Sequence, residues 1–408
     1  MKKTIAFIIA SAFVFPAAAQ YVEQGLLFSQ TFPSMTARSL SMGGAFSSLG
    51  GDLSAAYLNP AGLGMYRKSE LSLSPAIAYI KSTTEYQNEN GEDFRYKFMF
   101  GSAGYVSTYK AKREKGLVGT SFSLAYNRLN DFHNNIYMRG INPSGSLADF
   151  FLVQSKDIHP DDMLNNGMFG ERLAFDAYVI DTVPGSPTSY TTPVPLGVTQ
   201  RRSIETEGGA GEWSIGFGLN FSHVFYFGLG LGINQINYSK TLVHSETDDA
   251  NLNIFNNFRY TEKVDLSGAG ASLKIGFIAR PIPILRLSGA LHTPIYYNIS
   301  EDYDYYMSSY FDDGFSPTVE PIYGEFDYKL VTPLKVLGGL SVQIGKMGLI
   351  ATDVEYVDYS TIRYRNEDVA DDITSLNSYI QEDYKSVLNL KAGGELRFGQ
   401  LSLRAGGG

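Results

Sequence analysis

Residues 36–66 read TARSLSMGGAFSSLGGDLSAAYLNPAGLGMY, and this stretch determines how the rest of the chain is interpreted. It is rich in Gly, Ala and Ser, carries few charges and ends in Asn59-Pro60-Ala61-Gly62. A long series of alternating, aromatic-rich segments follows it, with the period of two that indicates β-strands. We therefore expect the later strands to form a wall and residues 36–66 to lie inside that wall.

The alternation is clearest in two consecutive segments, 213–221 and 225–233. Large apolar residues occupy the odd positions, while Gly, Ser, Asn and Tyr occupy the even ones. A soluble sandwich would place charges on its water-facing side, but here the second face is uncharged over whole strands. A large apolar face opposite a small or polar one is typical of a barrel in lipid. The pattern predicts an all-β fold, a transmembrane antiparallel β-barrel.

Composition narrows the class of protein further. The chain has 408 residues, of which 18% are charged and 13% aromatic, and it contains no Cys. The lack of Cys excludes disulfides, thiolate metal sites and a Cys nucleophile. Residues 1–19 combine two lysines, a short apolar run and Ala17-Ala18-Ala19, which predicts a signal peptide cleaved before Gln20; the alternative is a buried N-terminal helix. Its removal changes the formal charge from -9 to -11, so nucleic acid is not an expected partner.

The connections between the expected strands alternate in length. Short turns on one side and long loops on the other are typical of bacterial outer-membrane barrels, with the short turns in the periplasm. The short connections are 110–116, 222–224, 281–283, 345–348 and 399–400, and the long ones are 81–93, 129–211, 241–257, 307–321 and 366–378.

The later strands are expected to be longer than a bilayer requires. They span 262–280, 284–306, 322–344, 349–365 and 379–398, whereas roughly 9–11 residues suffice to cross. Their excess length is expected to stand above the membrane as a wall around the mouth. The sequence ends at 401–408 within an apparent strand, after about eleven strands. Because bacterial barrels have even strand numbers, one or three further strands are expected beyond Gly408.

The long connection 129–211 is not uniform. Leu147, Phe150 and Phe151 have helical spacing, and so do the apolar residues of 163–177, so two short helices are expected. A Pro-, Ser- and Thr-rich run, 183–195, follows them. The apolar residues of this loop either pack it onto the rim or capture a ligand.

No catalytic constellation is visible in the sequence. The five His residues are scattered, and no HExxH, GxSxG or paired-Cys motif occurs, so we expect no enzyme, no cofactor and no metal. Two acidic runs, 159–162 and 246–249, could bind a divalent cation through oxygen ligands or could be solvated loop tips. No helix follows Gly228, Gly230 and Gly232, so they are not a phosphate loop; they are expected to let the inner stretch approach the wall.

Several motifs resemble the FadL/TodX family of outer-membrane transporters for long-chain fatty acids and other hydrophobic molecules. The resemblance begins with Gly43-Gly44-Ala45 and with 52–57, DLSAAY, and continues with 59–63, NPAGL, which matches the NPA signature at the end of that family's N-terminal plug. Residues 332–335, TPLK, and 348–356, GLIATDVEY, resemble its later barrel strands. The resemblance covers most of residues 20–408.

This resemblance implies a fourteen-stranded barrel with an N-terminal plug in its lumen. The implied division is a plug at 20–67 and a barrel at 68–408. In the implied mechanism, loops capture a hydrophobic ligand, the ligand moves to a lumen site, the plug rearranges, and the ligand leaves sideways through a gap beside a kinked strand. The implied protein is a monomer in the outer membrane of a Gram-negative cell, in contact with its lipid, with the plug at the periplasmic side. The alternative is a non-transporting barrel that acts as a binding or assembly partner in envelope protein secretion.

The candidate ligand contacts are apolar side chains from the plug and from the long loop. Burial of an alkyl chain supplies about 0.8 kcal/mol per CH₂, and a carboxylate head group would favour arginine. The apolar candidates are Phe28, Phe32, Met35, Leu40, Met42, Phe46, Phe150, Phe151, Leu164, Phe169 and Phe175. Arg38 and Arg67 are candidates for the head group, or for a plug-to-wall ion pair and a periplasmic anchor. Gly43, Gly44, Asn59, Pro60 and Ala61 are the candidate gate motif.

Overall fold

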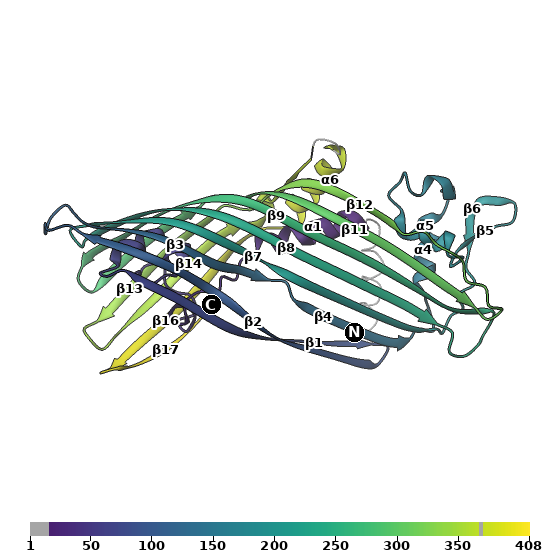
Figure 1. Cartoon of the computed structure of the whole chain (residues 1–408), viewed down its shortest axis with the longest axis horizontal. Helices are drawn as coiled ribbons and strands as arrows, with labels where there is room; N and C mark the ends of the chain where they lie inside the picture. The colour runs from purple at the N-terminus through teal and green to yellow at the C-terminus, as the bar shows by residue number, and fades with distance from the viewer. Residues whose placement is uncertain (1–15, 367–369) are drawn as a thin grey trace.

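The computed structural model describes residues 16–366 and 370–408, so most of the expected signal peptide lies outside the described residues. A single antiparallel sheet, strongly curved along an elongated molecule, dominates the fold (Figure 1). Its main path follows, in order, β1 (Glu70–Tyr86), β2 (Glu89–Lys110), β3 (Leu117–Asp131), β7 (Thr199–Phe221), β8 (Phe225–Thr247), β9 (Phe255–Ile282), β10 (Leu285–His292), β13 (Lys335–Ile344), β14 (Gly348–Asp358), β16 (Ser386–Phe398) and β17 (Leu401–Gly407).

Four further strands extend this sheet at the end opposite the short turns. They are β4 (Asn134–Ile141), β11 (Tyr296–Phe311), β12 (Ile322–Val331) and β15 (Arg363–Arg365). β9 pairs with β10 in one half and with β11 in the other. The break between them is Thr293-Pro294-Ile295, and a second break, Thr332-Pro333-Leu334, lies beside it. Each proline removes a ladder donor, and the two threonine hydroxyls bond the backbone N–H groups of Leu273 and Ile295 instead, both at 2.9 Å.

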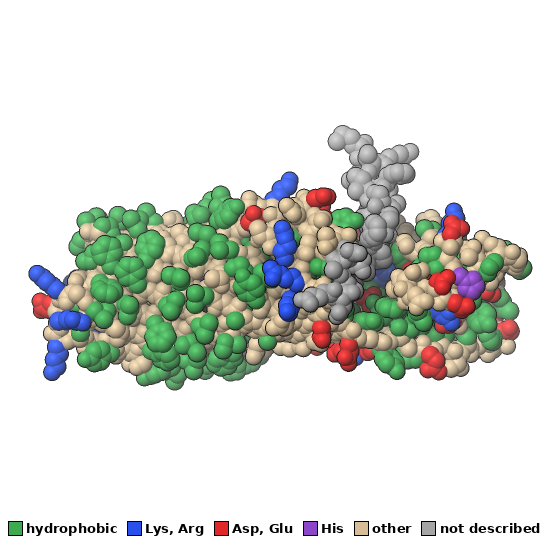
Figure 2. Space-filling model, turned by 90° about the horizontal axis from the view of Figure 1, so that it is seen from above, with side chains coloured by type: hydrophobic (Ala, Val, Ile, Leu, Met, Phe, Trp, Pro, Cys, Tyr) green, Lys and Arg blue, Asp and Glu red, His purple; other side chains and the backbone are tan. Residues whose placement is uncertain are grey.

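A belt of apolar side chains surrounds the half of the sheet that carries the short turns. On β8 the outward residues from Phe225 to Ile233 are large and apolar, and the outward positions turn polar from Gln235. Figure 2 shows the same division on one face, with hydrophobic side chains gathered on the half that carries the short turns. The stretch from Phe225 to Ile233 is about long enough to cross a bilayer. β8 and β9 therefore continue well beyond this apolar stretch, as expected for β9 but not for β8.

The loops differ from the expected ones in four places. Residues 81–93 are not a long loop, because β1 and β2 join through a tight turn at Gln87 and Asn88, both at positive φ; this backbone matches the twist of a hairpin. β8 continues to Thr247 and β11 to Phe311, which shortens two further loops. The outward faces there are polar, so the membrane pattern does not reveal the strands. Residues 379–383 belong to helix α6 (Ala370–Asp383) and not to a strand.

The connection 129–211 is more structured than a loop. It contains the end of β3, all of β4 and the start of β7. The two expected helices are present as α4 (Leu147–Ser155) and α5 (Phe169–Asp176), with the short turn η2 (Pro160–Asp162) between them. The run 183–195 contributes to a small hairpin of β5 (Asp181–Val183) and β6 (Ser186–Thr191). In Figure 1 these elements form a cap at the end of the molecule away from the short turns.

The chain before β1 lies on the concave face of the sheet. Helix α1 (Pro16–Ser29) leads into residues 30–66, which we call the inner segment. It contains α2 (Ala37–Leu40), α3 (Ala55–Leu58) and the 3₁₀ helix η1 (Pro60–Met65). Most of its side chains are buried, including Met42, Ala56, Ala61 and Leu63, all at 0% exposure. No helix in the described part of the chain is both long and apolar enough to cross a bilayer.

Candidate functional site

The inner segment fits the wall because the wall is glycine where the two meet. A Cβ atom at any of six wall glycines would overlap atoms of the inner segment: Gly218 on β7, Gly228 on β8, Gly276 on β9, Gly339 on β13, Gly393 on β16 and Gly406 on β17. At Gly228 the overlap is with Pro60, as expected of that glycine. Gly230 has ordinary clearance from Pro60, and Gly232 faces Glu212 and Ser272 instead. Of these three glycines, only Gly228 makes the close approach to the inner segment that the sequence pattern predicted.

The Asn59-Pro60-Ala61 motif is a helix start that also bonds the wall. Asn59 caps η1, accepting from the backbone N–H of Ala61 at 3.1 Å, and Pro60 occupies the first helical position. The Asn59 amide donates to the carbonyls of Ser47 at 3.0 Å and Phe277 at 3.2 Å. Phe277 lies on β9, so one side chain organises the turn and attaches it to the sheet.

Two buried wall carboxylates hold the other half of the inner segment. Asp353 on β14 accepts from the backbone N–H groups of Phe46 and Ser47, both at 2.8 Å, and from the Ser47 hydroxyl at 2.7 Å. Glu395 on β16 accepts from Arg38 at 3.0 Å. Arg38 therefore forms an ion pair between the inner segment and the wall. Gly43 and Gly44, at φ of 66° and 74°, turn the backbone between these contacts.

A buried ion pair also lies on the inner face of the wall. Lys274 on β9 bonds Glu212 on β7 and lies over the Tyr57 ring, 4.0 Å from its centre. His292 on β10 contacts the carbonyl oxygen of Leu58 at 3.1 Å through Nε2. The inner segment is thus held by charged and polar wall residues as well as by packing.

A gap opens in the wall where β2 separates from β3. Their pairing runs from Lys110–Gly119 to Ser102–Asn127 and ends there. Beyond that point β3 is kinked, with a bulge between Arg128 and Asn130 opposite β7, on which Gly208 has a φ of 107°.

The inner segment occupies the edge of β3 that β2 has left. The N–H of Phe32 donates to Leu129 at 2.7 Å, and that of Ser34 donates to Arg128 at 2.8 Å. On the other side, the ideal Cβ of Gly101 on β2 lies 2.9 Å from the Cβ of Ser34. Phe32 is 68% exposed, so this side chain is not part of a core.

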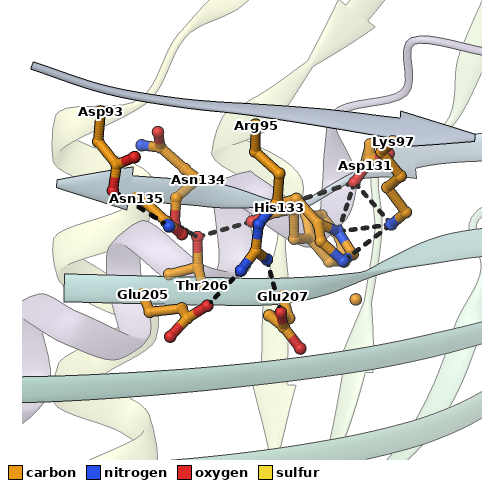
Figure 3. A network of polar contacts seen from close by, with 12 residues as sticks. Asp93, Arg95, Lys97, Asp131, His133, Asn134, Asn135, Glu205, Thr206 and Glu207 are labelled. Atoms are coloured by element: carbon orange, nitrogen blue, oxygen red, sulfur yellow. Dashed lines mark hydrogen bonds and ion pairs between the residues drawn. The ribbon is translucent and has the colours of Figure 1, made fainter. Parts of the chain in front are cut away.

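Side chains, not backbone, join β2 to the wall above the gap (Figure 3). Arg95 bonds Glu205 and Glu207 of β7, each at 2.7 Å. Lys97 lies 3.5 Å from Asp131, whose carboxylate contacts His133 at 2.7 Å. A connection made through side chains can separate without breaking a backbone ladder.

The lumen beside the inner segment is filled with aromatic side chains. Phe28 of α1 packs edge-on against Phe132 at 5.5 Å and Tyr238 at 5.6 Å. The same cluster extends to Tyr364 on β15 and to Ile380 on α6. The Tyr384 hydroxyl after α6 donates to the Val22 carbonyl at 3.0 Å. Helix α1 thus occupies the space in which a lumen ligand is expected.

The cap has its own apolar core, separate from the inner segment. Phe151 is buried against Tyr260, and Phe169 stacks on Tyr303 at 5.4 Å. Glu246 at the end of β8 accepts from the N–H of Leu147, at 2.8 Å, and from the Ser146 hydroxyl, at 2.5 Å, at the start of α4. Burial raises the pKa of Glu171 in α5. No group of three or more potential ligands is placed to hold a metal ion within residues 16–366 and 370–408.

The expected ligand residues do not form one site. Phe28, Met35, Met42 and Phe46 belong to one buried cluster, the same that includes Tyr364 and Ile380, whereas Phe32 is exposed at the gap. Leu40 and Leu164 are exposed, at 49% and 45%. Phe150, Phe151, Phe169 and Phe175 belong to the cap core or its margin. Arg67 follows the inner segment and faces the mouth at the short turns.

Sequence reasoning missed the wall residues that hold the inner segment. Asp353, Glu395, Lys274 and Glu212 all lie at inward positions, and each is followed in its strand by an exposed apolar residue, namely Val354, Leu396, Ile275 and Trp213. A charged residue at an inward position could have indicated such a contact, because a buried charge needs a partner inside the wall. The identity of that partner could not be predicted from the alternating pattern.

Comparison with solved structures identifies the architecture. The Pseudomonas putida toluene transporter TodX matches with a TM-score of 0.50 and 13% identity over 92% of this chain and 83% of that one. This chain has the fold of the FadL and TodX channels. A Pseudomonas aeruginosa FadL homologue matches with a TM-score of 0.50 and 12% identity over 93% of this chain and 80% of its own. The deltaS2 mutant of the TodX monoaromatic hydrocarbon channel matches at 0.52 and 12%, over 91% and 81%.

These matches confirm the fold class and the structural side of the resemblance. No protein-family model matches the sequence, and no curated protein matches it significantly. Of the matched structures, TodX is described as a toluene transporter and as a monoaromatic hydrocarbon channel.

Proposed function

We propose that this protein is an outer-membrane channel that takes up small hydrophobic molecules passively. The short turns face the periplasm and the cap faces the outside. The inner segment is a plug, and the gap between β2 and β3 is the sideways exit into the lipid. The fold supports this proposal, since TodX transports toluene. Monoaromatic hydrocarbons and fatty acids are the ligand classes that we propose to test.

The observation that most supports the proposal is that residues 32–34 bond to β3 beyond the point where its pairing with β2 ends. A barrel wall normally has no free edge, because closure pairs every strand. Here two hydrogen bonds from the inner segment, at Phe32 and Ser34, occupy an edge inside the wall. Movement of that short segment would open the gap without unpairing any strand. The driving force for a ligand is burial of apolar surface, about 0.8 kcal/mol per CH₂, and Phe28 and its aromatic partners provide an apolar place on the way.

A disulfide between residues 34 and 101 tests this exit. The chain has no Cys, so S34C/G101C introduces the only possible bond. The Cβ separation of 2.9 Å between these positions needs an adjustment of about 1 Å to suit a disulfide. We expect uptake of radiolabelled toluene or oleate by cells carrying the oxidised double variant to fall to background, and a reductant to restore it.

The single variants S34C and G101C serve as matched controls. Uptake by each single variant should be the same under both redox conditions, and G101C also controls for the Cβ atom that it adds 2.9 Å from the Cβ of Ser34. Full uptake by the oxidised, cross-linked protein would refute an exit at this gap. Uptake of neither probe by the parent chain would favour the alternative of a non-transporting assembly partner.

A further inference from the structure

The mouth at the short turns contains a deep, basic vestibule beneath the inner segment. It has a volume of about 1430 Å³, and inner-segment residues such as Gly50 and Met65 contribute to its lining. Eight of the lining residues are Lys or Arg, and one, Glu114, is an acid. Figure 2 shows Lys and Arg side chains at this end of the molecule. Charge of one sign in a cleft with low-dielectric walls concentrates anions there.

Most of these cations have no carboxylate partner. Arg38 and Arg397 share Glu395. Glu395 lies outside the lining and also bonds Arg404, and among the lining residues themselves eight cations against Glu114 leave an excess of seven positive charges. Within the described part of the chain, Arg67 has no ion pair, and Arg280 bonds only the carbonyl of Pro283, at 2.9 Å. The protein therefore leaves this charge to be balanced by something else.

Arginines from the inner segment and from the wall line the vestibule. Arg286 on β10 donates to the Leu49 carbonyl at 2.8 Å, so its guanidinium already contacts the inner segment. Arg280, Arg38 and Arg67 are all close enough to act electrostatically on Arg286. Arg67, Arg280 and Arg286 also act together on Tyr226, which lines the same vestibule. The guanidinium groups of Arg38, Arg67, Arg280 and Arg286 thus face one vestibule.

We propose that this vestibule binds an oxyanion of the phosphate class between Arg67 of the chain leaving the inner segment and Arg286 of the wall. Guanidinium groups recognise phosphate with two parallel hydrogen bonds. An anion here would relieve the repulsion among the arginines. It would also connect the end of the inner segment to β10 and so stabilise the closed arrangement. The phosphate could be free in the periplasm or carried by a lipid head group.

The test measures anion binding by the purified full chain in a neutral detergent at low ionic strength. The probes are inorganic phosphate, dihexanoyl phosphatidylglycerol and, as a zwitterionic reference, dihexanoyl phosphatidylcholine, measured by titration calorimetry. We expect R67Q/R286Q to bind the anionic probes at least about tenfold more weakly than the parent chain, because hydrogen bonds to charged groups are lost. Added salt should weaken binding to the parent chain.

R139Q/R259Q is the matched control, since it removes the same charge from two exposed arginines of β4 and β9. It should bind the probes like the parent chain. Because Arg67 is exposed, R67Q alone can replace the double variant if that variant does not fold. If inorganic phosphate binds, the ligand of the vestibule is a free anion. If phosphatidylglycerol binds and inorganic phosphate does not, the ligand is a lipid head group. Equal binding by the two double variants, or no binding of either anion, would overturn the proposal. The experiment uses no hydrophobic substrate, so its result is independent of transport.

Discussion

Replacing Asp353 with alanine should release the inner segment while the wall remains folded. Asp353 is buried, at 5% exposure, and accepts three hydrogen bonds from Phe46 and Ser47. Two of the donors are backbone N–H groups that have no other partner within the described residues once the carboxylate is gone. The inner segment would then keep its apolar packing but lose the contact that fixes its centre to β14.

The expected size of the effect follows from these bonds. A hydrogen bond to a charged group contributes about 1.5–3 kcal/mol. Losing the two backbone bonds should therefore weaken docking of the inner segment by about 3–6 kcal/mol. Since 1.4 kcal/mol corresponds to a factor of ten, amide exchange in residues 42–60 should accelerate by about a hundredfold or more. D353N keeps one acceptor oxygen and should show a smaller effect.

Hydrogen exchange followed by mass spectrometry on the detergent-solubilised protein measures this directly. Amides of β8 and β9 provide an internal reference, because they should remain protected. The matched control is D265A, which removes an outward carboxylate of β9 whose nearest cation, Lys263, is 3.9 Å away. Equal protection of residues 42–60 in D353A and D265A would refute the reasoning, and so would loss of protection throughout the wall.

Three further variants test other contacts. G43V adds a side chain at a positive φ against the backbone of Gly407, so protease sensitivity of the inner segment should rise while the heat-modifiable gel mobility of the barrel persists. E246A removes the carboxylate that caps α4 and should destabilise the cap by about 2–4 kcal/mol, seen as faster exchange in residues 147–155 with unchanged exchange in residues 36–66. Burial raises the pKa of Glu171, so the pKa of this carboxyl is higher in the folded state than in the unfolded state. Its ionisation therefore lowers the stability of the cap as pH rises through the folded-state pKa. E171Q should slow amide exchange in α5 at pH 7 and leave it unchanged at a pH below both pKa values.

The apolar outward face of the wall could be predicted from the sequence. The residues at 213–221 and 225–233 alternate because one face is apolar and exposed, as the proposed contact with lipid requires, and the other meets the inner segment. Lipid tolerates few polar side chains, so the pattern survives in every strand that crosses it. The same requirement does not apply beyond the membrane, where the outward faces of β1, β2 and β8 become polar. The hairpin turn at Gln87 and Asn88 was therefore hidden in a polar run.

The candidate site was predicted less well than the fold. The inner segment could be recognised by its small residues, and Asn59 and Pro60 have local roles that any helix start would require. The partners of that segment are hundreds of residues away, as with Phe46 and Asp353. Pairing across such distances depends on how the sheet curves, which local periodicity does not encode. A gap beside a kinked strand was expected from the resemblance. Its position could not be predicted, because it depends on the bulge in β3 and on the residue at which β2 stops pairing with β3.

The spread of contacts along the inner segment has a consequence for the order of folding. This segment is synthesised before any strand, yet Arg38 bonds Glu395, 357 residues later, and Gly43 packs against Gly407. Bringing such distant parts of the chain together costs conformational entropy before any contact compensates for it. Assembly should therefore end with docking of the inner segment, and a wall that forms first must stay wide enough to admit it. A slow final phase in refolding, lengthened in D353A but absent when residues 30–66 are supplied already cross-linked to the wall, would be its kinetic signature.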